Sequence, residues 1–148
     1  MEDISRLNDR ERAFVMSRRL ARLAPVDARG EPYLVPVCFA YDGTRFLTPI
    51  DEKPKRGDRP LKRMRNIQAT GRAALLFDHY DDADWSRLAW VMVRGAAAVW
   101  EPDHPDHAGA VALLRARYRQ YAAMALEALP VIAVTPRRIM SWGALERA

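Results

Sequence analysis

The chain contains β-rich segments that follow one another directly, separated only by tight turns. The clearest pair is 33–41 and 45–50, with Asp42-Gly43 in the turn between them. An Asp-Gly pair in this setting favours a hairpin turn, because glycine readily adopts positive φ. Strands joined by short turns pair antiparallel, whereas a parallel sheet would need a helix after nearly every strand. The sequence therefore predicts a mainly antiparallel sheet.

The remaining periodicities place helices at both ends of this sheet and between its strands. Asn8 or Asp9 is expected to cap the first helix, and Gly71 to end the second. Pro36 indicates an edge position, a break or a bulge in its strand. The expected fold class is α+β, a small barrel of six or so strands with flanking helices. Helices are predicted over 10–19, 59–69 and 105–126, and strands over 23–26, 33–41, 45–50, 73–77, 88–100 and 131–134, with a further short strand over 137–142.

Bulk properties favour one domain over residues 1–148. A hydrophobic content of 49% and a charged content of 29% are ordinary for a globular protein. Cys38 is the only cysteine, which excludes an intrachain disulfide and favours a cytoplasmic location. No apolar run reaches the roughly 18 residues that a membrane span needs, so we expect none.

A basic stretch, DEKPKRGDRPLKRMRN (51–66), lies between two predicted strands. Such a density of cations needs an anion, which could be solvated counter-ions, a nucleic-acid backbone or the phosphate of a cofactor. No aromatic residue in the stretch is available to stack on bases, which argues against nucleic acid. Its cations are Lys53, Lys55, Arg56, Arg59, Lys62, Arg63 and Arg65.

Other candidate functional residues are isolated. His79 could act as a general acid, although a hydrogen-bonded histidine at a strand end is the better interpretation. His104 and His107 flank Asp106, but without further ligands they predict a helix start rather than a metal site, and we expect no metal. Trp85 lies in a polar loop, where an aromatic side chain could cover a cofactor or a substrate.

Several strings occur in the order typical of one superfamily. They are ARLAPVDARGEPYLVPVCFAYDGTRF (Ala21–Phe46), DEKPKR (Asp51–Arg56), LKRMRNI (Leu61–Ile67), LLFDHYDD (Leu75–Asp82) and DWSRLAWVMVRGAA (Asp84–Ala97). In this set the chain resembles the pyridoxamine 5'-phosphate oxidase-like, FMN-binding split β-barrel superfamily. Within that superfamily it is similar to the branch of probable deazaflavin (coenzyme F420)-dependent enzymes.

The resemblance implies a homodimer with a cofactor in each of two grooves at the subunit interface. Its phosphate would be held by Lys53, Lys55, Lys62 and Arg63, since cations and helix N-terminal amides form an anion site. The ring would lie along the second and third strands, near Val35, Pro36, Val37, Thr48 and Ile50. The surplus cations of the stretch fit the acidic tail of a deazaflavin.

The implied function is an oxidoreductase that moves a hydride between reduced F420 and a small organic acceptor. An FMN-dependent oxidoreductase on the same fold and a non-catalytic flavin- or haem-binding protein remain as alternatives. The chain departs from the oxidase itself in two places: Leu34 or Val35 stands where an arginine would contact the cofactor, and no clear substrate-binding tail follows. Oxidation of vitamin B6 is therefore not expected, and no catalytic side chain is assigned.

Overall fold

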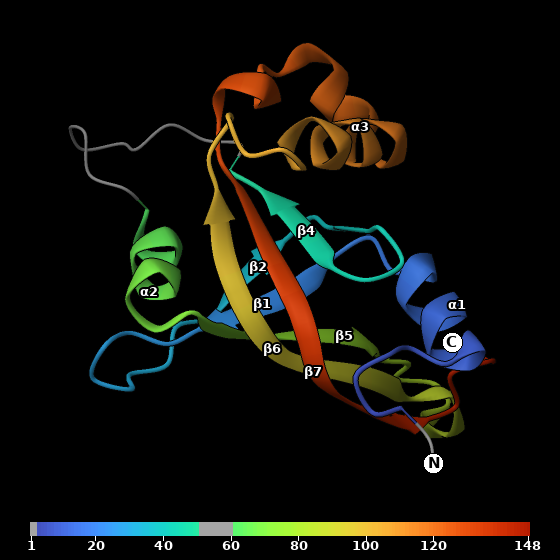
Figure 1. Ribbon diagram of the computed structural model, residues 1–148. Coiled ribbons are helices and arrows are strands. Elements are labelled where there is room, and N and C mark those ends of the chain that lie inside the picture. The colour runs from blue at the N-terminus through green and yellow to red at the C-terminus, as the bar shows by residue number, and fades with distance from the viewer. Residues whose placement is uncertain (1–2, 51–60) are drawn as a thin grey trace.

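The computed structural model describes residues 3–50 and 61–148 and contains one curled antiparallel sheet with three α-helices (Figure 1). All strand pairs are antiparallel, as the sequence predicts, and the strand order is β2-β1-β5-β6-β7-β4-β3. The elements are α1 (Asp9–Ser17), β1 (Ala21–Pro25), β2 (Val35–Val37), β3 (Ala40–Tyr41), β4 (Phe46–Pro49), α2 (Lys62–Thr70), β5 (Arg72–His79), β6 (Ala89–Trp100), α3 (His107–Arg117) and β7 (Val131–Gly143), with 3-10 turns η1 (Trp85–Arg87), η2 (Arg119–Ala123) and η3 (Leu126–Ala128).

The sheet curls into a half-barrel around a core of aromatic and aliphatic side chains. The ring of Phe77 on β5 lies 4.8 Å from that of Phe39 and 5.2 Å from that of Phe46 on β4, measured between centroids. In the sheet, β4 and β5 are separated by β6 and β7, so this contact requires curvature. The two edge strands, β2 and β3, are joined through Cys38 and Phe39 alone, which brings the sheet edges next to each other.

Local signals explain most of the element ends. Asn8 caps α1 in a capping box: its side chain accepts from the Glu11 N–H, and the Glu11 carboxylate accepts from the Asn8 N–H. Gly71 ends α2 in the left-handed conformation with φ 64°. Asp42 orders the β3–β4 turn by accepting from the N–H groups of Thr44 and Arg45. These signals behave as the sequence predicts.

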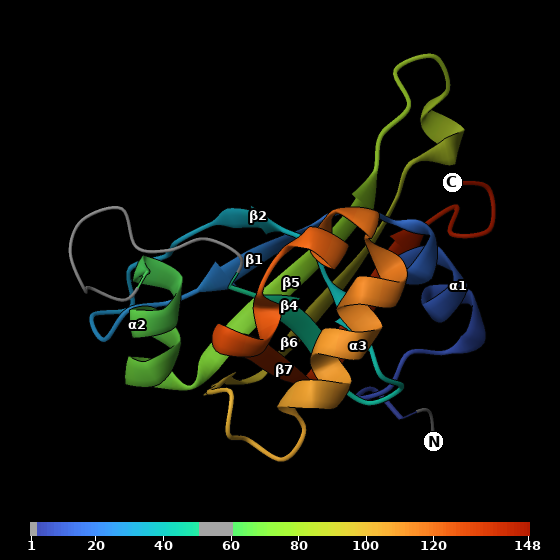
Figure 2. The same ribbon diagram turned by 90° about the horizontal axis from the view of Figure 1, so that it is seen from above.

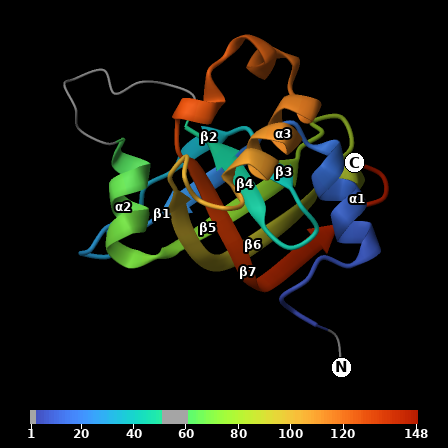
Figure 3. The ribbon, with the colours of Figure 1, turned by 45° about the horizontal axis from the view of Figure 1, so that its top comes forward.

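A second, smaller core lies under α3, which covers the β4 side of the sheet (Figures 2 and 3). Its members include Leu47 on β4, Leu114 on α3 and Val131 on β7. The prediction of one long helix over 105–126 was wrong, because α3 ends at Arg117 and two 3-10 turns follow. The Arg115 guanidinium holds these turns by donating to the Tyr121 and Met124 carbonyls and by pairing with Glu127.

The strands differ from the prediction in two places. The segment 33–41 forms two short strands, β2 and β3, and Pro36 lies on the edge strand β2, which is one of the outcomes that proline predicts. The separate strands expected over 131–134 and 137–142 are one strand, β7. A β-bulge links its halves: Arg94 faces Arg138 and Gly95 faces Pro136, so that Arg137 has no partner on β6.

Candidate functional site

The N-terminus of α2 carries two of the predicted cofactor-binding cations. Lys62 is exposed, whereas Arg63 is buried, with 8% of its surface accessible. Leu61 stands at the N-cap and provides no side-chain acceptor for the first turn, which contains no acidic residue. Free backbone N–H groups and adjacent cations together attract an anion.

A buried amide lies one turn further along the same helix. Asn66 is 3% exposed, and its Nδ2 has no hydrogen-bond partner among the described residues. A buried donor left without an acceptor costs free energy, so such a group in a native fold needs an explanation. An oxygen-rich anion bound beside α2 would supply an acceptor. The described side chains here therefore fit a phosphate-bearing group in their chemistry.

The residues predicted to contact the cofactor ring differ in their access to solvent. Thr48 and Ile50 are each 3% exposed, and Ile50 is part of the main core. Val37 is also buried, Val35 is half-buried and Pro36 is exposed. The ring-binding role of these five residues stays a prediction, with Val35 and Pro36 the members that a ligand can reach from outside the protomer.

The described residues do not bring the remaining predicted positions together with α2. Trp85 is 69% exposed in the β5–β6 connection, which projects from the body at the opposite end from α2 (Figure 2). The tryptophan is therefore far from α2 in this protomer, and its role at a cofactor stays a prediction. Lys53 and Lys55 lie outside the described residues, so their role also stays a prediction.

An apolar surface that the sequence prediction missed covers the convex face of β5, β6 and β7. We call it the outer aromatic surface; it consists of Leu76, Trp90, Met92, Met140 and Trp142. Cross-strand register aligns Leu76, Met92 and Met140 in one row, and Trp90 with Trp142 in the next. Trp142 is 55% exposed, and a pocket of about 430 Å³ opens beside it. The alternation of Trp90 and Met92 against Val91 and Val93 was the available sequence signal.

His79 lies at the margin of this pocket. The Arg18 guanidinium lies 3.0 Å from His79 Nδ1, and since arginine only donates, Nδ1 accepts and Nε2 carries the proton. That Nε2 is buried without a partner among the described residues. Burial lowers the pKa of Arg18, while the nearby Asp78 carboxylate acts in the opposite direction. His79 is thus a hydrogen-bonded histidine at the end of β5, as the sequence predicts, and it is half-buried.

The other two histidines have structural roles. His104 stacks on Trp100 with ring centroids 4.4 Å apart, and its Nδ1 accepts from the Asp106 N–H. His107 is 2% exposed, and its Nε2 lies 2.7 Å from the Leu129 carbonyl oxygen. Within residues 3–50 and 61–148, no group of three or more His, Cys, Asp or Glu side chains is arranged to hold a metal ion.

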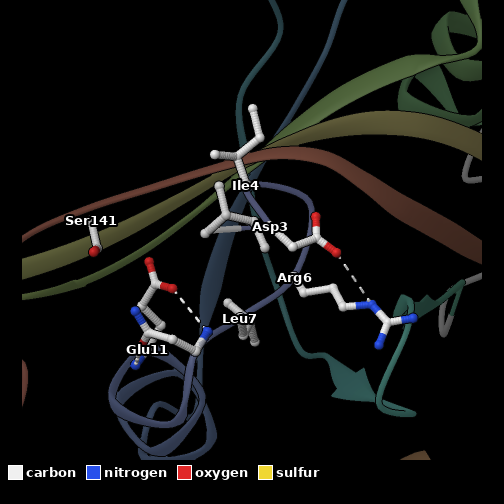
Figure 4. A pocket seen from close by; sticks show the side chains of 8 residues that line it. Asp3, Ile4, Arg6, Leu7, Glu11 and Ser141 are labelled. Atoms are coloured by element: carbon white, nitrogen blue, oxygen red, sulfur yellow. Dashed lines mark hydrogen bonds and ion pairs between the residues drawn. The ribbon is translucent and has the colours of Figure 1, made fainter. Parts of the chain in front are cut away.

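A further pocket, of about 370 Å³, lies where the N-terminal segment crosses β7. Figure 4 shows Arg6 turned toward Asp3, with which it pairs, and the Glu11 carboxylate accepting from the Asn8 N–H of the capping box. Hydrogen bonds from the Ser5 hydroxyl and N–H lower the pKa of Asp3. Because these groups satisfy one another, the pocket presents little chemistry to a ligand.

Family comparison agrees with the architecture. The family model described as "Pyridoxamine 5'-phosphate oxidase" matches residues 7–143. The chain belongs to this family, whose fold is the α+β split barrel. A search of curated proteins finds no match. Across the described part of the chain, none of the helices combines the length and apolarity that crossing a membrane requires.

Solved structures share this fold at low sequence identity. A haem storage protein of Vibrio cholerae, HutZ, has 15% identity over 93% of this chain and 94% of its own, with a TM-score of 0.68. A conserved hypothetical protein of Mycobacterium tuberculosis has 21% identity over 97% and 88%, with a TM-score of 0.69. A haem-binding protein of Mycobacterium smegmatis has 19% identity over 94% of this chain and 55% of its own, with a TM-score of 0.68. Identities at this level show the fold alone.

Proposed function

We propose that the protein is a homodimeric oxidoreductase that binds coenzyme F420 at the subunit interface and transfers a hydride to or from a small organic substrate. One observation carries this proposal: α2 combines Lys62, the buried Arg63 and an Asn66 amide that has no acceptor among residues 3–50 and 61–148. Membership of an oxidase family supports a redox role.

The protein's own contribution would be binding, orientation and exclusion of water, since the deazaflavin supplies the hydride-carrying carbon. Lys62 and Arg63 would bind the phosphate, together with Lys53 and Lys55. Val35 and Pro36 on the edge strand, with Val37, Thr48 and Ile50 behind them, would define the wall against the ring. In a twofold dimer, the projecting Trp85 would cover the cofactor of the partner subunit.

The outer aromatic surface supports the dimer. Trp142 is exposed and the other four members are half-buried, and an apolar patch of this kind on a sheet face can mark an interface. A twofold interface is self-complementary, so the same Met92 and Trp142 would contribute from both subunits. Burial of this surface would also enclose the pocket that Leu76, Trp90 and Trp142 line.

A second candidate function is non-catalytic haem binding. It is favoured by the apolar pocket at the outer aromatic surface and by the haem storage and haem-binding proteins that share this fold. FMN on the same fold is the other alternative. It would need fewer cations than F420, because FMN lacks the acidic tail.

A side-by-side titration tests the proposal. Purified protein is titrated with F420, FMN and haemin, and binding is followed by fluorescence or absorbance. We expect F420 to bind most tightly and Lys62→Ala to weaken it by about tenfold or more, as loss of one charge-assisted contact predicts. Arg119→Ala, which removes another exposed cation, is the control and should bind as the wild type does. If Lys62→Ala binds F420 as tightly as the wild type does, the N-terminus of α2 is not part of the cofactor site. If haemin binds most tightly of the three, non-catalytic haem binding is favoured.

A further inference from the structure

Four arginines gather on the convex face of the sheet, away from the N-terminus of α2. Three of them, Arg72, Arg94 and Arg137, line a pocket of about 400 Å³. The fourth, Arg138, lies directly across from Arg94 in the β6–β7 register. We call this set the arginine cluster. Arg72 lies just after the C-terminal end of α2, and Lys62 lies at its N-terminal end. The nine residues of this helix span about 13 Å and separate the arginine cluster from Lys62.

The β-bulge creates the cluster. In an uninterrupted strand Arg137 and Arg138 would point to opposite faces, but the bulge leaves both exposed beside Arg94. Gly95 permits the bulge, since a Cβ there would lie 2.1 Å from the Thr135 carbonyl oxygen. The same glycine, with Ala24, Val26 and Ala74, gives the pocket its small, apolar walls.

The charges of the cluster are not balanced within the described residues. The ion pairs of the described residues involve arginines outside the cluster, such as Arg22 with Asp78, Arg45 with Asp106 and Arg115 with Glu127. None of the described residues that line the pocket is acidic. In the adjacent β1–β2 turn, the Asp27 carboxylate is occupied by the N–H groups of Arg29 and Glu31.

Like charges directly opposite each other on neighbouring strands destabilise a sheet. Arg94 and Arg138 hold that relationship, and Arg72 lies diagonally from Arg94, about 7–8 Å between Cβ atoms in such geometry. Guanidinium groups bind phosphate and carboxylate oxygens in pairs of parallel hydrogen bonds. A multivalent anion would therefore replace repulsion with several charge-assisted bonds.

We propose that the pocket at the arginine cluster is a second binding site, independent of the redox cofactor, for a small organic anion. The ligand carries at least two negative charges, as phosphate or carboxylate, on a compact apolar body that fits between Ala24, Ala74 and Gly95. The guanidinium groups of Arg72, Arg94, Arg137 and Arg138 bind the charges.

The test uses the whole chain, with pyrophosphate and citrate as probes in buffers matched for ionic strength with NaCl. Binding is measured by calorimetry and by the shift of the melting temperature. We expect either probe to raise the melting temperature of the wild type. The double variant Arg94→Gln/Arg138→Gln should lose at least tenfold in affinity, while Arg119→Gln binds normally. Without a probe, the double variant should melt at the same temperature as the wild type or higher, because repulsion is relieved.

Two matched variants separate this site from the cofactor site. Lys62→Ala should bind the probes as the wild type does. If Lys62→Ala abolishes probe binding and the double variant does not, the anion binds at α2 and the proposal is wrong. The proposal is also wrong if neither probe binds the wild type. Binding of a hexaglutamate peptide without binding of either small anion would show that the cluster takes an acidic chain and not a small anion. Failure of F420 binding leaves the proposal unaffected.

Discussion

The Tyr118 hydroxyl, at the end of α3, accepts a hydrogen bond of 3.0 Å from the backbone N–H of Phe39, in the connection that joins the two edges of the sheet. The same hydroxyl donates to the Arg19 carbonyl oxygen at 3.0 Å, and the tyrosine is 8% exposed. One phenol thus fastens α3 to the β2–β3 connection and to the segment that enters β1.

Tyr118→Phe should therefore lower the free energy of unfolding by about 1–3 kcal/mol, since it leaves a buried N–H and a carbonyl without that partner. Urea denaturation of both proteins measures the difference. Tyr80→Phe is the matched control: Tyr80 is 61% exposed and its hydroxyl donates to the exposed Asp82, so the change should stay within about 0.5 kcal/mol. Equal effects of the two substitutions would show that Tyr118 does not fasten the sheet edges.

Gly95→Ala tests the bulge. Its new methyl group would lie 2.1 Å from the Thr135 carbonyl oxygen and 2.8 Å from the Thr135 carbonyl carbon, both backbone atoms. We expect a loss of about 1–3 kcal/mol in unfolding free energy. In Gly109→Ala the methyl group meets nothing within 4 Å and lies in α3, so stability should rise by up to about 1 kcal/mol. Thermal and urea unfolding compare the pair, and a neutral Gly95→Ala would argue against a tight β6–β7 bulge.

Met92→Glu tests the proposed dimer. A carboxylate in the middle of the outer aromatic surface would be buried without a partner on association, and each twofold interface would contain two. We expect the variant to be monomeric at micromolar concentration in sedimentation experiments where the wild type is dimeric. Leu113→Glu, on the exposed side of α3, should leave the wild-type mass unchanged. If the Met92→Glu protein is still dimeric, the outer aromatic surface is not the dimer interface.

The ion pair between Arg115 and Glu127 predicts that the stability of the fold depends on pH. The hydrogen bond from Arg115 lowers the pKa of Glu127 to about 2 from 4.5. A depressed folded-state pKa means that the carboxylate stabilises the fold above about pH 4.5, and that this contribution is lost as pH falls toward 2. Glu127→Gln should therefore melt below the wild type at pH 7, with the difference shrinking between pH 4.5 and 2. Glu101→Gln, also exposed, serves as the control; a difference independent of pH would contradict the assignment.

The sequence predicts the fold well where its signals are local. The Asp42-Gly43 turn, the Asn8 cap and the Gly71 stop all act within a few residues, and each is confirmed. The longest predicted helix failed because its end depends on Arg115, which binds carbonyls that helical periodicity cannot reveal. The β-bulge at Arg137 was missed for a related reason: it exists only relative to the facing strand.

The candidate site is less predictable, because its parts lie on different elements. The basic stretch indicated Lys62 and Arg63, but the buried Asn66 amide emerges only when α2 packs against β1 and β6. Trp85 could be singled out as exposed, yet not placed at the far end from α2. The opposition of Arg94 and Arg138 depends on the register of two strands, about which a single sequence says little.

The position of β7 has a consequence for synthesis of the protein. Among the described strands this one comes last along the chain, yet it lies between β6 and β4 and is the neighbour through which β4 and β3 join the sheet. The strands β2, β1, β5 and β6 can pair with one another as soon as they have been synthesised. β4 lacks its partner strand β7 until residues 131–143 follow, and Phe46 and Leu47 stay uncovered until then. Closure of the half-barrel therefore depends on a strand that is made after the other described strands, and an unpaired edge with exposed apolar side chains is prone to aggregate in the meantime.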